Sequence, residues 1–299
     1  MKTNSITRNP KHTTQNPQPE SHNSLPRACN SKLSLGFSPC PNDTFIFHAL
    51  IKGLVKDERI TFEERLLDVE QLNQLALAAA LDVTKVSFHL YGHIRDSYTL
   101  LPTGAALGRG CGPLLISRDY CSIDSLASKP VALPGRHTTA ALLLRLFAPQ
   151  LKNLIYMPFD RIMAAVAQGE VSAGVIIHES RFTFKKYGLQ QLIDLGEWWE
   201  RDSGCPIPLG GIVAKKSLGG ELIDSVGRLI GESIAHAVAN PESPQGYIRE
   251  HAQEMSADIC AAHIELYVND FSRDLGEEGR RAVDLLMEKG EAAGLLPSS

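Results

Sequence analysis

A short strand followed by a polar turn and then a helix recurs along this chain, and this order constrains the fold most strongly. LSLGF (33–37) leads through SPCPND into TFIFHALIKGLV (44–55), whose apolar residues have helical spacing. The order returns in ALDVTKVS (80–87), PVALPGRHT (130–138) and AGVIIHES (173–180), each followed by a helical pattern. Strands that alternate with helices predict an α/β fold with largely parallel sheets.

Two segments divide the pattern into two lobes. LGRGCGPLLISR (107–118) and PIPLGGIVAKK (206–216) have the character of strands that cross between lobes, and 299 residues is long for one hydrophobic core. We therefore place lobe 1 in residues 31–116 and 209–299, with a helical C-terminal region, and an inserted lobe 2 in residues 117–208. Two α/β lobes joined by two crossing segments are typical of a periplasmic-binding-protein-like fold.

The first thirty residues differ from the rest in composition. They are rich in Asn, Thr, Ser and Pro and nearly devoid of bulky apolar side chains, so they cannot offset the entropy of ordering. We interpret residues 1–30 as a disordered extension, because they also lack the apolar stretch of a secretory signal peptide.

Charge and hydropathy exclude several classes of partner. The net charge is −4, and the basic excess of residues 1–30 leaves an acidic body, which gives no electrostatic reason to bind nucleic acid. No apolar run approaches the roughly 18–20 residues that a membrane span needs. Six scattered cysteines have no metal-ligand spacing. We expect a cytoplasmic protein, a monomer or homodimer, that binds neither nucleic acid nor membrane.

Two polar turns present groups that suit an anion. PGRHTTA (134–140) brings Thr138 and Thr139 to the start of an apolar helix, where free N–H groups and the helix dipole favour a carboxylate or phosphate. The alternative is capping of the helix by Thr138 alone. In TKVS (84–87), Lys85 either pairs with an anionic substrate or is a solvated lysine at a strand edge. The local patterns leave these alternatives open.

His178 ends the apolar strand pattern GVII and precedes a new helical segment. Ligands of open α/β sheets bind at this end of the strands, and histidine suits proton transfer near neutral pH. A core histidine with satisfied nitrogens gives the same pattern, so a catalytic base is one of two interpretations. Neither HLYGH (89–93) nor the pair His178–Glu179 has the spacing of a zinc site, and GxSxG is absent from the sequence. We expect no metal.

Several segments together resemble one enzyme family. They are GFSPCPNDTFIFHAL, TKVS, GAALGRGCGPLL, LPGRHTTA, DRIMAAVAQGEVSAGVIIHESRFTFKKYGL and DLGEWWE. In order and with few gaps over residues 33–290, the chain resembles the 1,4-dihydroxy-6-naphthoate synthases of menaquinone biosynthesis. The resemblance implies a periplasmic-binding-protein type II fold, carbon–carbon lyase activity on cyclic dehypoxanthine futalosine, and no metal or organic cofactor.

The resemblance also implies residue roles. The histidine of IIHESRF is the proposed general base of the family, which is His178 here. The segments that the family assigns to substrate contacts match Lys85, Val86, Ser87, Thr139 and Ala140. Thr138 is a further candidate, because it lies at the start of the helix predicted after PGRHT. The expected partner is a small anionic substrate.

Two other functions stay open. A solute-binding module without turnover has the same fold, because a fold does not fix a function. A chorismate dehydratase-like enzyme shares both fold and pathway, although the HESRF and GRHTTA motifs favour the synthase. Asn42 and Arg109 are further candidates to line the site, while Glu179 and Arg181 either contact substrate or support their loop.

Overall fold

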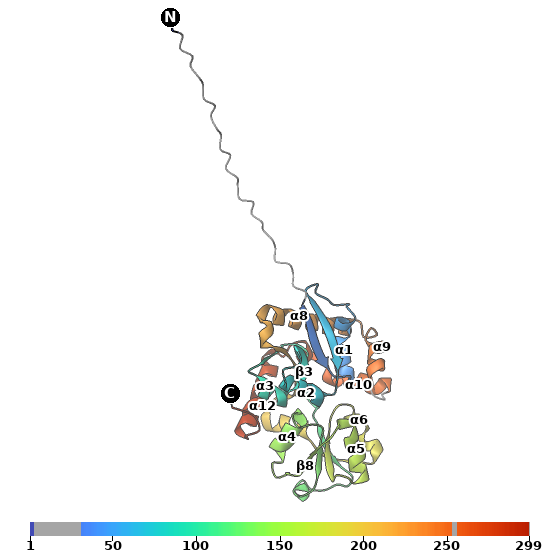
Figure 1. The fold of residues 1–299 in the computed structure, drawn as a ribbon. Helices are drawn as coiled ribbons and strands as arrows, with labels where there is room; N and C mark the ends of the chain where they lie inside the picture. The colour runs from blue at the N-terminus through green and yellow to red at the C-terminus, as the bar shows by residue number, and fades with distance from the viewer. Residues whose placement is uncertain (3–30, 253–255, 299) are drawn as a thin grey trace.

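The computed structural model describes residues 1–2, 31–252 and 256–298, and the statements below refer to them. Two lobes, each built on its own β-sheet, stack along the long axis of the molecule (Figure 1). The predicted two-lobed α/β fold is therefore confirmed. The predicted disordered extension lies, but for its first two residues, outside the described residues.

The sheet of lobe 1 has the order β2-β1-β3-β11-β4, with β5 also paired to β11. Its strands are β1 (Ser31–Phe37), β2 (Ile60–Leu66), β3 (Val83–Ser87), β4 (Tyr98–Leu100), β5 (Ala106–Gly108) and β11 (Ile207–Lys215). The sheet of lobe 2 has the order β10-β6-β9-β7-β8. Its strands are β6 (Leu114–Ser117), β7 (Val131–Leu133), β8 (Leu154–Tyr156), β9 (Ala173–Ile176) and β10 (Gln190–Asp194).

Helices cover both sheets. Those that follow strands of lobe 1 or form the C-terminal region are α1 (Pro41–Ile51), α2 (Val69–Leu77), α3 (Phe88–Ile94), α8 (Gly220–Ala239), α9 (Gln245–His251), α10 (Ala257–Tyr267), α11 (Asp270–Arg273) and α12 (Gly276–Ala292). Those of lobe 2 are α4 (Thr139–Phe147), α5 (Phe159–Gln168), α6 (Ser180–Thr183) and α7 (Leu195–Ser203). Short 3₁₀ turns occupy Asp124–Leu126, Phe184–Tyr187 and Lys216–Leu218. None of the helices in the described part of the chain is long and apolar enough to cross a membrane.

The sheets are largely parallel in strand direction, as predicted, and each contains one reversed strand. β1 pairs in parallel with β2 and β3, and β7 does so with β8 and β9, but β11 is antiparallel to β3 and β6 is antiparallel to β9. The reason is that β6 and β11 carry the chain into each lobe from the other one. They therefore run away from the boundary between the lobes, whereas β1, β3, β7 and β9 run towards it.

The two predicted lobe boundaries fall a few residues too late. The chain leaves the first sheet after β5 and enters the second with β6, so the boundary between residues 116 and 117 cuts through β6. The boundary between 208 and 209 cuts through β11 in the same way. Both errors arise because a crossing strand is apolar along its whole length, which hides where one sheet ends.

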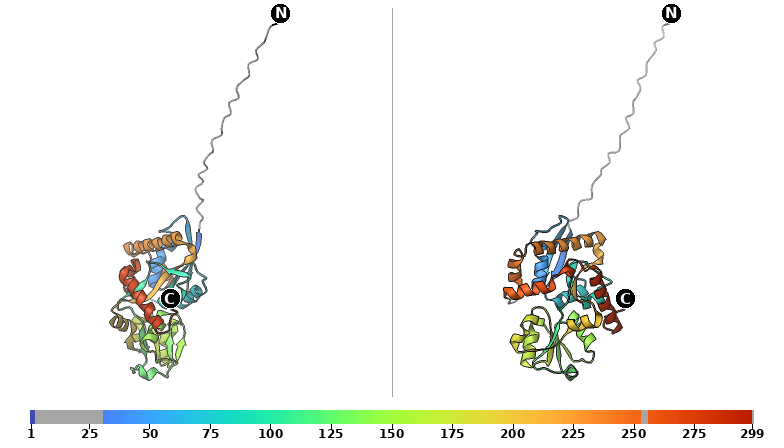
Figure 2. Two further views of the ribbon diagram at one scale, coloured as in Figure 1. Left: turned by 90° about the vertical axis from the view of Figure 1, so that its left-hand side faces the viewer. Right: turned by 180° about the vertical axis from the view of Figure 1, so that it is seen from behind.

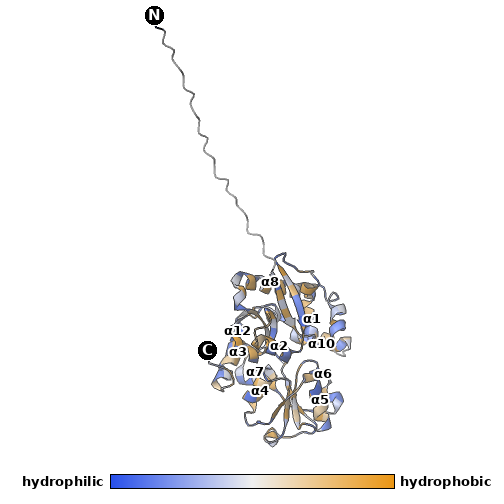
Figure 3. Ribbon diagram, in the orientation of Figure 1, coloured by the Kyte–Doolittle hydropathy of each residue, from blue (hydrophilic) through white to orange (hydrophobic). Residues whose placement is uncertain are grey.

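The largest apolar cluster runs through both lobes. It joins Phe88 and Leu107 of lobe 1 to Leu115 and Leu142 of lobe 2, and Leu286 of α12 belongs to the same cluster. α12 packs against α3 and α4, which belong to different lobes (Figure 2). Orange residues lie along strands of both sheets, while the surrounding helices show mixed colours (Figure 3). The lobes are therefore held together by a continuous core as well as by the crossing segments.

Candidate active site

A cavity between the lobes is lined by residues at or after the ends of two pairs of parallel strands, one pair in each lobe. Ser38 follows β1, Ser87 ends β3, Thr138 follows β7 and His178 follows β9. Because all four strands point towards the boundary between the lobes, their polar ends meet there. The space among these segments is about 670 Å³, including its opening to solvent.

The structure brings all seven predicted site residues to this cavity. They are Lys85, Val86, Ser87, Thr138, Thr139, Ala140 and His178. Asn42 lines it as well. Arg109 does not belong to the lining and instead pairs with Glu278 at 3.1 Å, with both side chains about half exposed. The roles of these residues stay predictions, but their meeting in one place is what a shared ligand requires.

His178 has an unusual backbone conformation. Its backbone φ of 56° lies in the left-handed region, which residues other than glycine rarely adopt. Non-glycine residues in this region are often found at functional sites. The ring is half-buried, packs edge-on against Phe159 at 5.2 Å between centroids, and makes no hydrogen bond to any described residue. A satisfied core histidine does not fit these observations. The ring is available to a ligand.

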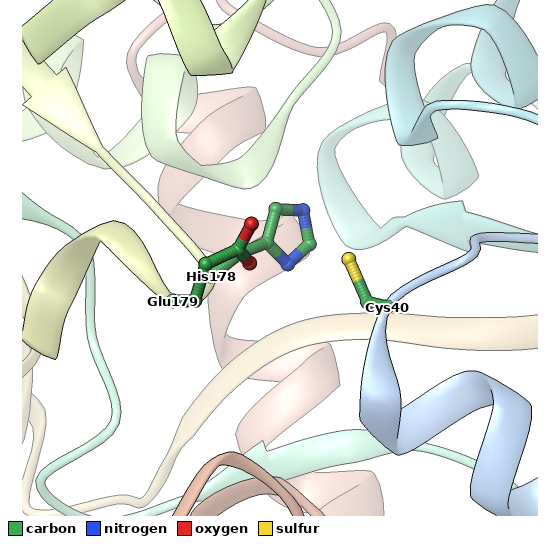
Figure 4. Close-up of side chains that lie close together, drawn as sticks. All are labelled: Cys40, His178 and Glu179. Carbon is green, nitrogen blue, oxygen red and sulfur yellow. The ribbon is translucent and has the colours of Figure 1, made fainter. Parts of the chain in front are cut away.

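Cys40 and Glu179 lie beside His178 (Figure 4). A ligand atom from each of the three side chains lies within 4.8 Å of the other two, so this group could hold a cation. Burial, with the Glu179 charge second, raises the pKa of the Cys40 thiol well above its usual value, which disfavours the thiolate that a metal needs. The spacing of metal-ligating residues in the sequence does not reveal this group, because Cys40 is remote in sequence from His178 and Glu179. A second cavity shares Ser38, Val69 and His178 with the first.

Lys85 is buried and paired rather than solvated. Its Nζ lies 3.1 Å from Asp43 Oδ1 and donates to the Gly104 carbonyl at 2.9 Å. Asp43 Oδ2 also accepts hydrogen bonds from the hydroxyl and the N–H of Ser38, at 2.8 and 3.2 Å. Because Asp43 balances the charge of Lys85, the ammonium offers the cavity a hydrogen-bond donor more than a net charge.

The start of α4 combines capping with free donors. The Thr138 hydroxyl accepts from the first turn of the helix at 3.3 Å and donates to the Gly135 carbonyl at 3.0 Å. The Thr139 hydroxyl donates to the Leu209 carbonyl at 2.6 Å. The backbone N–H groups of Thr139 and Ala140 have no acceptor among the described residues. The two interpretations of this motif are therefore compatible, and the groups left for an anion are backbone N–H groups.

Sequence reasoning missed four polar residues of the cavity wall: Ser38, Asp43, His263 and Tyr267. His263 and Tyr267 lie four residues apart on α10, so they share a face of that helix. The stretch HIELY carried this spacing as its signal, but nothing local indicated that the helix would reach the cavity.

The architecture defines a protein with a periplasmic-binding-protein-like fold. The periplasmic aliphatic sulphonate binding protein SsuA of Escherichia coli matches with a TM-score of 0.61 and 14% identity, over 89% of each chain, a likeness that shows the fold alone. A solved structure of a protein from Archaeoglobus fulgidus matches with a TM-score of 0.83 and 35% identity, over 89% of this chain and 98% of that one.

Sequence comparison narrows this class to one family. The family model for menaquinone biosynthesis matches residues 33–292, and the chain belongs to this family. A relative from Thermus thermophilus is 50% identical over 267 residues, 89% of this chain and 97% of the relative. One from Streptomyces coelicolor is 42% identical over 271 residues, 89% of this chain and 95% of the relative. Both are named 1,4-dihydroxy-6-naphtoate synthase, which confirms the resemblance found in the sequence.

Proposed function

We propose that this chain is a lyase that converts cyclic dehypoxanthine futalosine to 1,4-dihydroxy-6-naphthoate in menaquinone biosynthesis, with His178 as the general base. The observation that carries the proposal is the meeting of His178, TKVS and GRHTTA in one cavity. The names of the two relatives support the same reaction.

The substrate is a benzoate with a ribose-derived ring, so the cavity must hold a carboxylate and several hydroxyl groups. The unpaired N–H groups of Thr139 and Ala140, at the positive end of the α4 dipole, suit the carboxylate. The Ser87 hydroxyl oxygen accepts from Asn73 at 3.1 Å, which leaves its own proton for the ligand. Together with the Lys85 ammonium, these groups line the cavity with hydrogen-bond donors.

His178 then acts on the substrate with a ring nitrogen that no described residue engages. The neutral imidazole takes a proton from a substrate hydroxyl or an activated carbon, which triggers cleavage of a carbon–carbon bond and release of the sugar fragment. Formation of the aromatic naphthoate supplies the driving force. General base catalysis contributes about 10²–10⁴-fold, and orientation in a cavity shielded from water supplies the rest.

The remaining expectations follow from this reaction. We place the enzyme in the cytoplasm, as a monomer or homodimer, because its proposed partner is a small anionic intermediate of a biosynthetic pathway. The proposal requires no metal or organic cofactor and no nucleic-acid or membrane partner.

Incubation of the purified chain with cyclic dehypoxanthine futalosine, followed by mass spectrometry, tests the reaction. We expect the naphthoate and the sugar fragment in equal amounts. Binding of the substrate without turnover would favour a solute-binding protein instead. Chorismate serves as the control substrate, and its dehydration would favour the related dehydratase.

A further inference from the structure

We infer that His263 binds the substrate, with Nδ1 accepting a hydrogen bond from one of the substrate's hydroxyl groups. The inference rests on the function proposed above and adds a residue that none of the sequence motifs assigns.

Hydrogen bonds determine which ring nitrogen of His263 carries the proton. The Asn42 amide Nδ2 donates to Asp43 Oδ1 at 3.0 Å, and Asp43 is itself held by Lys85 at 3.1 Å. Asn42 therefore turns its Oδ1, which can only accept, towards His263 Nε2 at 3.0 Å. Nε2 must donate, so the proton sits there and Nδ1 presents a lone pair.

The surroundings keep the ring neutral. Burial, with His178 second, lowers the pKa of His263 to about 3. At ordinary pH the Nδ1 lone pair is therefore present, but it is a poor base. A group of this kind positions a hydroxyl by accepting its hydrogen bond, and it leaves proton removal to His178.

Nδ1 of His263 is buried and has no hydrogen-bond partner within the described ranges, although the ring lines the cavity and is 0% exposed. A buried acceptor without a partner is costly, which favours a ligand that supplies one. The ring lies 6.3 Å from that of His178, centroid to centroid and nearly parallel at 21°. Both imidazoles therefore line the same cavity.

The remaining polar groups around the cavity explain why a hydroxyl is the expected partner. Lys85, Ser87 and the free N–H groups of Thr139 and Ala140 offer donors, which suit the substrate carboxylate. A substrate hydroxyl must also place its own proton on an acceptor. The lone pair of His263 meets this need beside the proposed base.

Two isosteric variants separate binding from structural support. His263→Gln keeps a donor near the Nε2 position, for Asn42, and removes the Nδ1 acceptor. His263→Asn keeps an acceptor near the Nδ1 position and removes the bond to Asn42. We expect kcat/KM to fall about 10-fold or more in His263→Gln, because a substrate hydroxyl loses its acceptor, and to fall less in His263→Asn. His48→Gln is the matched control, since the Nδ1 of His48 is also buried without a partner but His48 lines neither cavity.

The reverse order, with His263→Gln active and His263→Asn impaired, would show that the ring only holds Asn42 and would overturn the inference. Wild-type rates in both variants would overturn it as well. Absence of turnover in the wild type would instead overturn the proposed function, so the two failures are distinguishable. If the variants do not fold, a crystal structure of His178→Gln with bound cyclic dehypoxanthine futalosine decides. A hydroxyl oxygen within hydrogen-bond distance of Nδ1 supports the inference, and its absence contradicts it.

Discussion

Single residues in the cavity wall are held by charges and hydrogen bonds that water barely reaches. Lys85 and Asp43 are 5% and 2% exposed, so their ion pair is almost fully desolvated. Removing one partner of such a pair leaves an uncompensated buried charge, which costs far more than the pair contributes to stability.

We expect Lys85→Met to lower the free energy of unfolding by about 3–5 kcal/mol, because Asp43 loses its counter-charge. Urea denaturation measures the change. The double variant Lys85→Met/Asp43→Asn should recover much of the loss. As control, Arg109→Met breaks the half-exposed pair with Glu278 and should cost at most about 1 kcal/mol. Equal losses in the two single variants would contradict the account.

Buried histidines also make stability depend on pH. Burial is the first cause that lowers the pKa of His263 to about 3 and that of His89 to about 4, from a usual value of 6.5. The unfolded chain therefore takes up these protons near pH 6.5, whereas the folded chain does so only near pH 3–4. The contribution to stability is full above pH 6.5 and is lost as the pH falls through this window.

We expect the free energy of unfolding to decrease as the pH is lowered from about 6.5 towards about 4, and to decrease less steeply in His89→Gln. Urea denaturation at several pH values in this range measures both slopes. Identical slopes for wild type and His89→Gln would contradict the proposed origin.

At the scale of elements, α2 and the loop before α4 connect the lobes at the rim of the cavity. The carboxylate of Glu70, on α2, accepts hydrogen bonds from the N–H groups of Arg136 at 3.1 Å and His137 at 3.2 Å. A Cβ on Gly135 would lie 2.6 Å from the Glu70 carboxyl carbon, so only glycine permits this close approach. The contact fixes the loop that presents the start of α4.

We expect Glu70→Ala to raise KM about 10-fold while changing kcat less, because the anion-binding loop loses two charge-assisted hydrogen bonds but His178 is untouched. Steady-state kinetics on the proposed substrate provides both constants. Glu232→Ala, on the exposed face of α8, is the control and should leave KM unchanged. A fall in kcat at constant KM would contradict this role for the contact.

Some helices and strands could be predicted from the sequence better than others. Strand–turn–helix order placed Lys85, Thr138 and His178 correctly at strand ends, because local periodicity and turn residues define where elements begin. The direction of β6 and β11 was not predictable, since pairing depends on contacts remote in sequence. RFTFKKYGL shows the same limit, because a predicted helix became the short α6 and a 3₁₀ turn. His263 was missed because its helix meets the site only through tertiary packing.

At the scale of the whole molecule, the shared core distinguishes this chain from two lobes on a free hinge. Leu286 of α12 is 0% exposed and belongs to the apolar cluster that includes residues of both lobes. A core that continues across a boundary couples the two sides in unfolding.

We expect one cooperative unfolding transition in calorimetry, because neither lobe keeps its core when the other unfolds. Leu286→Ala should lower the free energy of unfolding by about 2–5 kcal/mol and leave a single transition. Two separate transitions in the wild type would show that the lobes are independent.

The role of His178 as the general base is tested by turnover of cyclic dehypoxanthine futalosine in the wild type and in His178→Gln. We expect naphthoate from the wild type and a kcat lower by about 10²-fold or more in the variant, with an unchanged melting temperature. Equal rates from both proteins, with the variant folded, would contradict the assignment of His178 as the base.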